Sequence, residues 1–290
     1  MNISYDCLPC LMKQVIKVAE TYTNDEELQH KIITKACKDF SNMTFKETAP
    51  EIGRKINLYA NEVIGDKDPY KELKDKSNDL AFQLIEEFGI KDIIKNSDDP
   101  IKTAIKLSVA GNIIDFSAIH DLKEGQVRSV ISNCINENLY GISIEDFKRK
   151  IDCSKEILFL GDNAGEIVFD KLLIDVLPKH KITYVVKDKP IVNDATMKDA
   201  MDVHMTDLVP VIDNGSDGQG TILRLCSDKF IKRFKKTDLI IAKGQANYET
   251  LSHIYDKEII FLFNIKCKRI AQSAKYNVGE LVMISSKTQE

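Results

Sequence analysis

The second half of the chain, from Asp152 onward, alternates short apolar runs with longer amphipathic stretches. This alternation is typical of βα units, in which each strand of a parallel sheet leads into a helix. Strands covered by helices on both faces are apolar almost throughout, as most of these runs are. The runs predict strands at 156–160, 182–186, 209–212, 239–242, 259–263 and 281–284. We therefore expect a doubly wound, mostly parallel, Rossmann-like α/β/α domain over residues 152–290.

The first half of the chain has a different apolar period. From Cys7 to about residue 150, apolar residues recur at helical spacing, and the breaks carry prolines or residues that cap helices. No run there predicts a strand. The fold class is therefore α/β, with an N-terminal bundle of about seven helices over residues 1–151 and the α/β domain after it.

Composition narrows the class of protein. The 290 residues are 43% hydrophobic, and 41 Lys and Arg face 45 Asp and Glu, so a folded core is expected and a nucleic-acid partner is not. A small molecule is the expected partner. No apolar run is long enough to span a membrane and no signal peptide is evident, which favours the cytoplasm. The sequence gives no indication of oligomeric state.

Polar residues collect where the predicted strands end. In an open parallel sheet these carboxyl ends meet in one crevice, where helix N-termini direct free N–H groups at a ligand. The segments that follow four of the strands are rich in oxygen-bearing side chains and glycine: residues 161–166, 192–196, 213–221 and 243–249.

Asp162, Asn163 and Asp194 offer the hard oxygen atoms that suit Mg²⁺ or Mn²⁺. Asp162 alone is more simply explained as an N-cap of the next helix. Three oxygen-rich turns on one edge of a sheet favour a ligand site over capping.

The glycine-rich segment Gly215–Thr221 and Lys243 are candidates for binding an anion. The backbone of such a segment can cradle a phosphate, although an ordinary turn with an Asx cap explains it equally well and it lacks the P-loop order. Lys243 leaves an apolar strand and could neutralise a phosphate as a point charge, although most lysines are only solvated.

Cys7 and Cys10 lie one helical turn apart at a predicted helix start, and the seven cysteines of the chain indicate reduced thiols. Two sulfurs bind a metal poorly without partners, and Cys267 could be a third ligand. Incidental burial and an auxiliary redox or metal site both remain open.

Several catalytic patterns are missing. The histidines show no H-E-x-x-H spacing, no G-x-S-x-G turn is present, and the dinucleotide fingerprint is absent after the first predicted strand of the second half. These absences disfavour zinc proteolysis, serine hydrolysis and a nicotinamide-dependent dehydrogenase.

Four motifs, in order along the chain, resemble those of the metal-dependent damage-control phosphatases, the DUF89 family. They are Gly111-Asn112-Ile113-Ile114-Asp115-Phe116, Gly161-Asp162-Asn163-Ala164-Gly165-Glu166, Asn193-Asp194 and Lys243-Gly244-Gln245-Ala246-Asn247-Tyr248-Glu249. The Cys7-x-x-Cys10 pair is similar to the branch found in archaea and some bacteria.

The resemblance implies a site and a substrate class. Asp162, Asn163 and Asp194 would bind Mn²⁺, Co²⁺, Ni²⁺ or Mg²⁺, and Lys243 would contact phosphate. Substrate contacts would come from residues of the same motifs and of the glycine-rich segment: Asn112, Asp115, Glu166, Gly215, Ser216, Asn247 and Glu249. The implied substrates are phosphorylated small metabolites, such as sugar phosphates, phosphopantetheine-like compounds and damaged by-products.

The expected activity is metal-dependent hydrolysis of phosphate monoesters without a covalent intermediate, with Glu166 or Glu249 as candidates to orient water or protonate the leaving oxygen. Two alternatives remain. One is a thiol-based redox or metal-carrier protein that uses Cys7 and Cys10, and the other is a module that binds a phosphometabolite without turnover.

Overall fold

The computed structural model describes residues 1–65, 68–113 and 124–288. The helices are α1 (Leu8–Tyr22), α2 (Glu26–Ser41), α3 (Ala49–Ile64), α4 (Lys71–Glu87), α5 (Ile90–Lys95), α6 (Pro100–Ile113), α7 (Glu124–Asn136), α8 (Ile144–Cys153), α9 (Glu166–Asp175), α10 (Met197–Asp202), α11 (Asp228–Lys236), α12 (Gly244–Leu251) and α13 (Lys268–Ala274). Among these described helices, none has both the length and the apolar character needed to cross a membrane.

Seven strands form one sheet: β1 (Leu139–Gly141), β2 (Ile157–Leu160), β3 (Ile182–Val186), β4 (Val211–Asp213), β5 (Leu239–Lys243), β6 (Ile259–Asn264) and β7 (Leu281–Ser285). Their order is β1-β7-β6-β5-β2-β3-β4, and all neighbours are parallel except β6 and β7. The chain runs outward from β2 through β3 to β4 and then returns to β5 on the other side of β2. The strand order therefore reverses between β2 and β5.

The predicted strands are all present, with one shift and one omission. β4 begins two residues later than predicted, after Pro210, which has no N–H to donate to a ladder. The expectation of no strand in the first half is wrong, because β1 pairs in parallel with β7 at the sheet edge. β1 is three residues long and mostly exposed, too short for an apolar period to reveal it.

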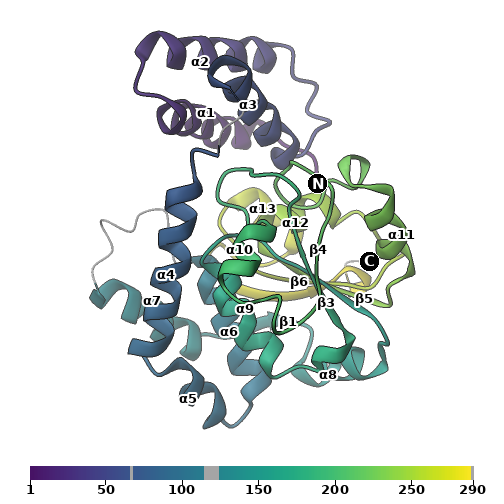
Figure 1. Cartoon of the computed structure of the whole chain (residues 1–290). Helices are drawn as coiled ribbons and strands as arrows, with labels where there is room; N and C mark the ends of the chain where they lie inside the picture. Colours follow the sequence, from purple (N-terminus) through teal and green to yellow (C-terminus); the bar gives the residue numbers. More distant parts are fainter. Residues whose placement is uncertain (66–67, 114–123, 289–290) are drawn as a thin grey trace.

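Helices cover both faces of the sheet, as Figure 1 shows. Alternate residues of β2 belong to different hydrophobic clusters: Ile157 and Phe159 pack with α4 to α9, whereas Leu158 and Leu160 pack with α11, α12 and α13. This two-sided burial confirms the predicted α/β/α arrangement.

Helices α1, α2 and α3 have a hydrophobic cluster of their own, built around residues such as Val15, Ile32 and Ile56, and they form the separate group at the top of Figure 1. Helices α4 to α8 instead share a core with the sheet. The first half of the chain is thus packed as two groups of helices, and the division at residues 151 and 152 stays a prediction.

Candidate functional site

Two loops meet at the carboxyl end of β2. The backbones of Asn163 and Asp194 form an isolated antiparallel bridge, and Ala195 N donates to Asp162 O at 2.8 Å. These bonds tie the turn after β2 to the loop after β3, as the sheet-edge reasoning predicted. The turn also lies beside β5, where the strand order reverses, which is where open α/β sheets bind ligands.

Two carboxylates and two amides form the centre of this site. The side-chain Nδ2 of Asn112 donates to Asp162 Oδ2 at 3.0 Å and to Glu166 Oε2 at 2.8 Å. The Nδ2 of Asn163 donates to the same two oxygens, at 3.0 and 3.2 Å. Asn112 comes from the end of α6, so the helical half reaches the site as the resemblance implied. Asp115 lies outside the described residues.

The carboxyl groups of this cluster are buried and close enough to one another to shift each other's pKa. Asp162 is 6% exposed, and burial, followed by the charges of Glu166 and Asp194, raises its pKa well above the ordinary value. Burial also raises the pKa of Asp194 to about 6, against the opposing effect of Lys187. Among the described residues, no group donates a hydrogen bond to Asp194 Oδ2, and the Lys187 ammonium lies 3.5 Å from it. The cluster is therefore suited to take up a proton or to bind a cation.

These residues fit a hard divalent cation by chemistry, with one rearrangement. Carboxylate and amide oxygens are its preferred donors, and the unpaired Asp194 oxygen offers a free one. Asn163 now directs its NH₂ group at the carboxylates, so its amide must turn before its oxygen can bind a metal. In the part of the chain that the structure describes, no three His, Cys, Asp or Glu side chains are arranged as a metal site by themselves. Ligation by Asp162, Asn163 and Asp194 stays a prediction.

Lys243 does not have the position that a phosphate contact needs. It is fully buried, and its ammonium donates to Glu166 Oε1 at 2.7 Å, to Asp170 Oδ1 at 2.6 Å and to Ser108 O at 3.0 Å. Burial lowers the pKa of Lys243, but the negative charges and hydrogen bonds of Asp170 and Glu166 raise it by more, so the pKa lies above its ordinary value. All three N–H groups are used, so Lys243 holds Glu166 in place and has none left for a ligand.

Gly244 allows β5 to approach the site closely. Its φ is +77°, and a Cβ there would lie 1.8 Å from Asp162 Oδ2. Only glycine fits this position without moving the carboxylate. The Lys243-Gly244 pair therefore serves the site through its backbone and through Glu166.

The glycine-rich segment is held by its own side chains. Gly215 N donates to Asp213, Ser216 N donates to Asn214 Oδ1 at 2.9 Å, and Gly218 N donates to Ser216 Oγ at 3.1 Å. The expected phosphate contacts from Gly215 and Ser216 are not supported, because their N–H groups are occupied. The alternative of an Asx-capped turn describes this segment.

Asn247 joins three parts of the sheet edge. Its Nδ2 donates to Lys243 O at 2.8 Å and Gly161 O at 3.3 Å, while its Oδ1 accepts from Thr221 Oγ1 at 2.7 Å. Asn247, which was expected to contact substrate, therefore links the ends of β2 and β5 through its side chain.

Glu249 lies apart from the carboxylate cluster. It lines a separate pocket of about 530 Å³ together with Cys7, Cys10 and Cys267. Burial raises the pKa of Glu249 to about 7, against the Met1 amino group. The three cysteines of the suggested thiol site thus share one pocket, although no three-residue metal cluster is present among the described residues.

Sequence reasoning missed three charged residues near the site. Lys187 follows β3, Asp170 lies one turn beyond Glu166 on α9, and Lys266 follows β6 and donates to Asn112 O at 2.9 Å. Lys187 and Lys266 both lower the pKa of Asp162. Their position just after strand ends is the signal that could have identified the two lysines.

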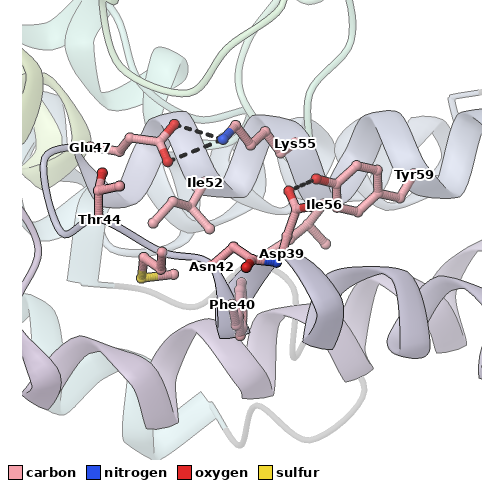
Figure 2. Close-up of a pocket in the computed structure, with 10 residues that line it drawn as sticks. Asp39, Phe40, Asn42, Thr44, Glu47, Ile52, Lys55, Ile56 and Tyr59 are labelled. Atoms are coloured by element: carbon pink, nitrogen blue, oxygen red, sulfur yellow. Dashed lines mark hydrogen bonds and ion pairs between the residues drawn. The ribbon is translucent and has the colours of Figure 1, made fainter.

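A pocket in the α1 to α3 group has a different character. Figure 2 shows Lys55 directed at Glu47 and Tyr59 directed at Asp39, and Lys55 Nζ lies 2.8 Å from Glu47 Oε1 and 3.1 Å from Glu47 Oε2. The pocket measures about 290 Å³. Lys55 is paired with Glu47, and Asp39 accepts a hydrogen bond from the neutral Tyr59 hydroxyl, so the lining residues offer no unpaired cation to an anionic ligand.

Buried carboxylates and amides at the reversal point of a doubly wound sheet define an α/β protein with a candidate ligand site at the strand ends. Residues 3–282 match the damage-control phosphatase ARMT1-like domain, and the chain belongs to that family.

Relatives match over nearly their whole length. A damage-control phosphatase of Archaeoglobus fulgidus is 34% identical over 97% of this chain and 98% of its own. One of Pyrococcus horikoshii is 33% identical over 99% of both chains, and an uncharacterized protein of Methanocaldococcus jannaschii is 34% identical over 98% and 95%. The crystal structure of a DUF89 family protein from Pyrococcus horikoshii is similar in fold, with a TM-score of 0.88, 31% identity, and coverage of 99% of this chain and 100% of that one.

Proposed function

We propose that this chain is a metal-dependent phosphatase that hydrolyses phosphate monoesters of small metabolites. The observation that carries the proposal is the buried cluster of Asp162, Glu166 and Asp194, in which Asp194 Oδ2 has no hydrogen-bond donor. Buried carboxylates of this kind call for a cation. The names of the relatives, damage-control phosphatases, support the reaction class.

Asp162, Asn163 and Asp194 are the proposed ligands of Mn²⁺, Co²⁺, Ni²⁺ or Mg²⁺. When bound, such an ion supplies a Lewis acid for the phosphoryl oxygen and lowers the pKa of coordinated water. The chain's own residues hold this site in shape. Glu166 is fully buried and is fixed on one oxygen by Lys243 and on the other by two amides, so in this proposal it positions Asn112 and Asn163 beside Asp162.

Positive charge for the phosphate comes from Lys266 in this proposal. Its side chain is exposed at the carboxyl end of β6, and its ammonium makes one described hydrogen bond, to Asn112 O. It therefore has N–H groups free for phosphoryl oxygens, unlike Lys243. Lys187 instead offsets the charge of Asp194.

The proposed substrates are sugar phosphates, phosphopantetheine-like compounds or damaged phosphometabolites, acted on in the cytoplasm without a nucleic-acid partner. The near balance of 41 basic and 45 acidic residues supports small substrates over nucleic acid.

The test is phosphate release from a panel of phosphate esters, p-nitrophenyl phosphate included, with each divalent metal. Asp162→Asn and Asp194→Asn should each lower kcat/KM at least about 100-fold, since each removes a charged ligand. Asp188→Asn, an exposed residue of the same loop as Asp194, is the matched control and should retain activity. Full activity in either ligand variant, or after EDTA treatment, would refute the metal site.

A thiol-based function is the second candidate, because Cys7, Cys10 and Cys267 line one pocket. A Cys7→Ser/Cys10→Ser variant separates the two: the phosphatase proposal expects ester hydrolysis to continue, whereas a thiol enzyme would lose its activity. Binding of a phosphate ester without phosphate release would instead indicate a sensor module.

A further inference from the structure

A third pocket borders the loop that carries Asp194. It has a volume of about 510 Å³ and lies between α3, the loop after β3 and the loop after β4. Its lining residues come from these elements and from the segment after α3: Arg54, Asn57, Leu58, Asn61, Asp68, Lys189, Pro190, Ile191 and Asp217. We refer to it as the α3 pocket.

The α3 pocket contains two hydrogen-bond acceptors to which no described residue donates. The Nδ2 of Asn57 donates to Gly53 O at 2.9 Å, and because a carbonyl can only accept, this bond fixes the orientation of the amide. Asn57 is only 4% exposed, and its Oδ1 is buried without a partner. Asn61 lies one helical turn further along α3, and its Oδ1 is also buried and unpaired. Unpaired buried acceptors are rare because they cost free energy, so two on one pocket wall indicate a missing donor.

The ion pairs of the pocket leave these amides free. Arg54 Nη2 donates to Asp217 Oδ2 at 2.9 Å, and Asp68 lies 3.0 Å from the ammonium of Lys74. Lys189 is exposed at the pocket and acts on the same Asp217 carboxylate, whose pKa it helps to lower, so the pocket has no unmatched negative charge among its described lining residues. The uncharged amide oxygens of Asn57 and Asn61 remain available to a ligand. They suit a neutral hydrogen-bond donor such as a hydroxyl group.

The α3 pocket is next to the carboxylate cluster. Ile191, on its wall, accepts a hydrogen bond from Asp194 N at 3.0 Å across a tight turn at Val192. Val192 has a φ of 46°, an unusual value for a β-branched residue, and the turn it makes returns the chain to the site. Lys74, which pairs with Asp68 on the pocket wall, is close enough to Asp194 to lower its pKa.

We propose that the α3 pocket binds the alcohol part of the phosphate ester, and that Asn57 and Asn61 accept hydrogen bonds from its hydroxyl groups. This inference rests on the proposed phosphatase function and specifies its substrate as an ester of a polyhydroxylated alcohol. An ester whose alcohol lacks hydroxyl groups leaves both acceptors unpaired and is selected against.

The cysteine-lined pocket is the less suitable place for such an alcohol. Its glutamines are already paired, Gln14 Nε2 with Gln219 Oε1 at 3.1 Å and Gln245 Nε2 with Glu249 Oε1 at 3.4 Å. Its unpaired buried atom in the described structure, Arg269 Nε, is a donor. Among the described residues, that pocket therefore has no buried acceptor that lacks a donor, unlike the α3 pocket.

The test compares glucitol 6-phosphate with p-nitrophenyl phosphate as substrates of the full chain with its preferred metal. The ratio of the two kcat/KM values should fall about fivefold in Asn57→Leu and again in Asn61→Leu, the size expected from one neutral hydrogen bond each. Asn42→Leu, an exposed amide after α2, is the matched control and should leave the ratio unchanged. An unchanged ratio in folded Asn57→Leu and Asn61→Leu proteins overturns the inference.

Two further measurements keep the outcome clear if Asn57→Leu does not fold. Asn61 is partly exposed, so Asn61→Leu should fold, and a thermal melt verifies it. Free glucitol should inhibit hydrolysis of p-nitrophenyl phosphate by the unmodified chain competitively, and more weakly in Asn61→Leu. Hydrolysis of both esters with no inhibition by glucitol and no change of ratio refutes the pocket alone. Hydrolysis of neither ester with any metal refutes the phosphatase function and the inference with it.

Discussion

Lys243→Met should destabilise the protein in a way that depends strongly on pH. The lysine is fully buried between Glu166 Oε1 at 2.7 Å and Asp170 Oδ1 at 2.6 Å. Methionine fills a similar volume but leaves two buried carboxylates without a cation. Removing one partner of a buried ion pair costs about 3–5 kcal/mol.

Protonation sets a limit to this loss. One of the two carboxyl groups can take up a proton, which from an ordinary pKa near 4.3 costs about 3.7 kcal/mol at pH 7 and about 1 kcal/mol at pH 5. The carboxyl pKa in the folded variant is raised, so the stability of the variant is present at low pH and is lost as the pH rises. The deficit relative to the unmodified chain should therefore grow from about 1 to about 4 kcal/mol between pH 5 and pH 7.

Urea unfolding of both proteins at the two pH values measures this difference. Lys179→Met, which removes an exposed pair with Asp175, is the control and should change stability little at either pH. Adding Glu166→Gln to Lys243→Met should recover part of the loss, because it removes one unpaired charge. A deficit that does not change between pH 5 and pH 7, or that stays below 1 kcal/mol, would refute the role given to Lys243.

Three other perturbations follow from the site. Since Asp194 must be deprotonated to bind a cation and burial raises its pKa to about 6, Mn²⁺ affinity measured by titration calorimetry should fall at least about tenfold per pH unit below 6, with the raised pKa of Asp162 adding to the loss, and an affinity independent of pH there would contradict this. The pKa of Glu249 is raised from 4.5 to about 7, so the stability that its protonated form contributes is lost as the pH rises from about 4.5 to about 7. Glu249→Gln should therefore remove up to about 3 kcal/mol of the pH dependence of the unfolding free energy measured in urea. An unchanged dependence of that free energy on pH would contradict this. Gly244→Ala should lower metal affinity and activity more than tenfold, because the added methyl group displaces Asp162. Gly279 also has a positive φ but has open space around it, so Gly279→Ala should affect neither quantity. Equal effects of the two variants would show that backbone strain alone is responsible.

The strands and the approach of the two loops could be predicted from sequence because both follow from local patterns. Continuous apolar runs mark buried parallel strands, and parallel strands bring their carboxyl ends to one edge, which places Asp162 near Asp194. Asn112 was reached only through the family resemblance, since nothing in the pattern of α6 indicates that its last turn meets β2.

The direction of a side chain was what the sequence could not provide. Lys243 and Asn247 occupy the motif positions that suggested ligand contacts, yet both direct their polar atoms into the protein. A strand-end lysine is equally compatible with solvent, phosphate or a buried carboxylate, and the choice depends on Glu166 and Asp170, which are far from it in sequence. Likewise, an Asx turn and a phosphate cradle have the same glycine-rich composition, so Gly215 and Ser216 could not be assigned without coordinates.

The two amides that bridge Asp162 and Glu166 have a consequence for how the protein matures. Because Asn112 and Asn163 already donate to these carboxylates, the chain can complete its fold before it encounters any ion. Rotation of the Asn163 amide would then replace its NH₂ group with its oxygen atom at the carboxylates, without any change in the surrounding core. For the metal site proposed above, this means that loading with a divalent ion would need no refolding of the chain.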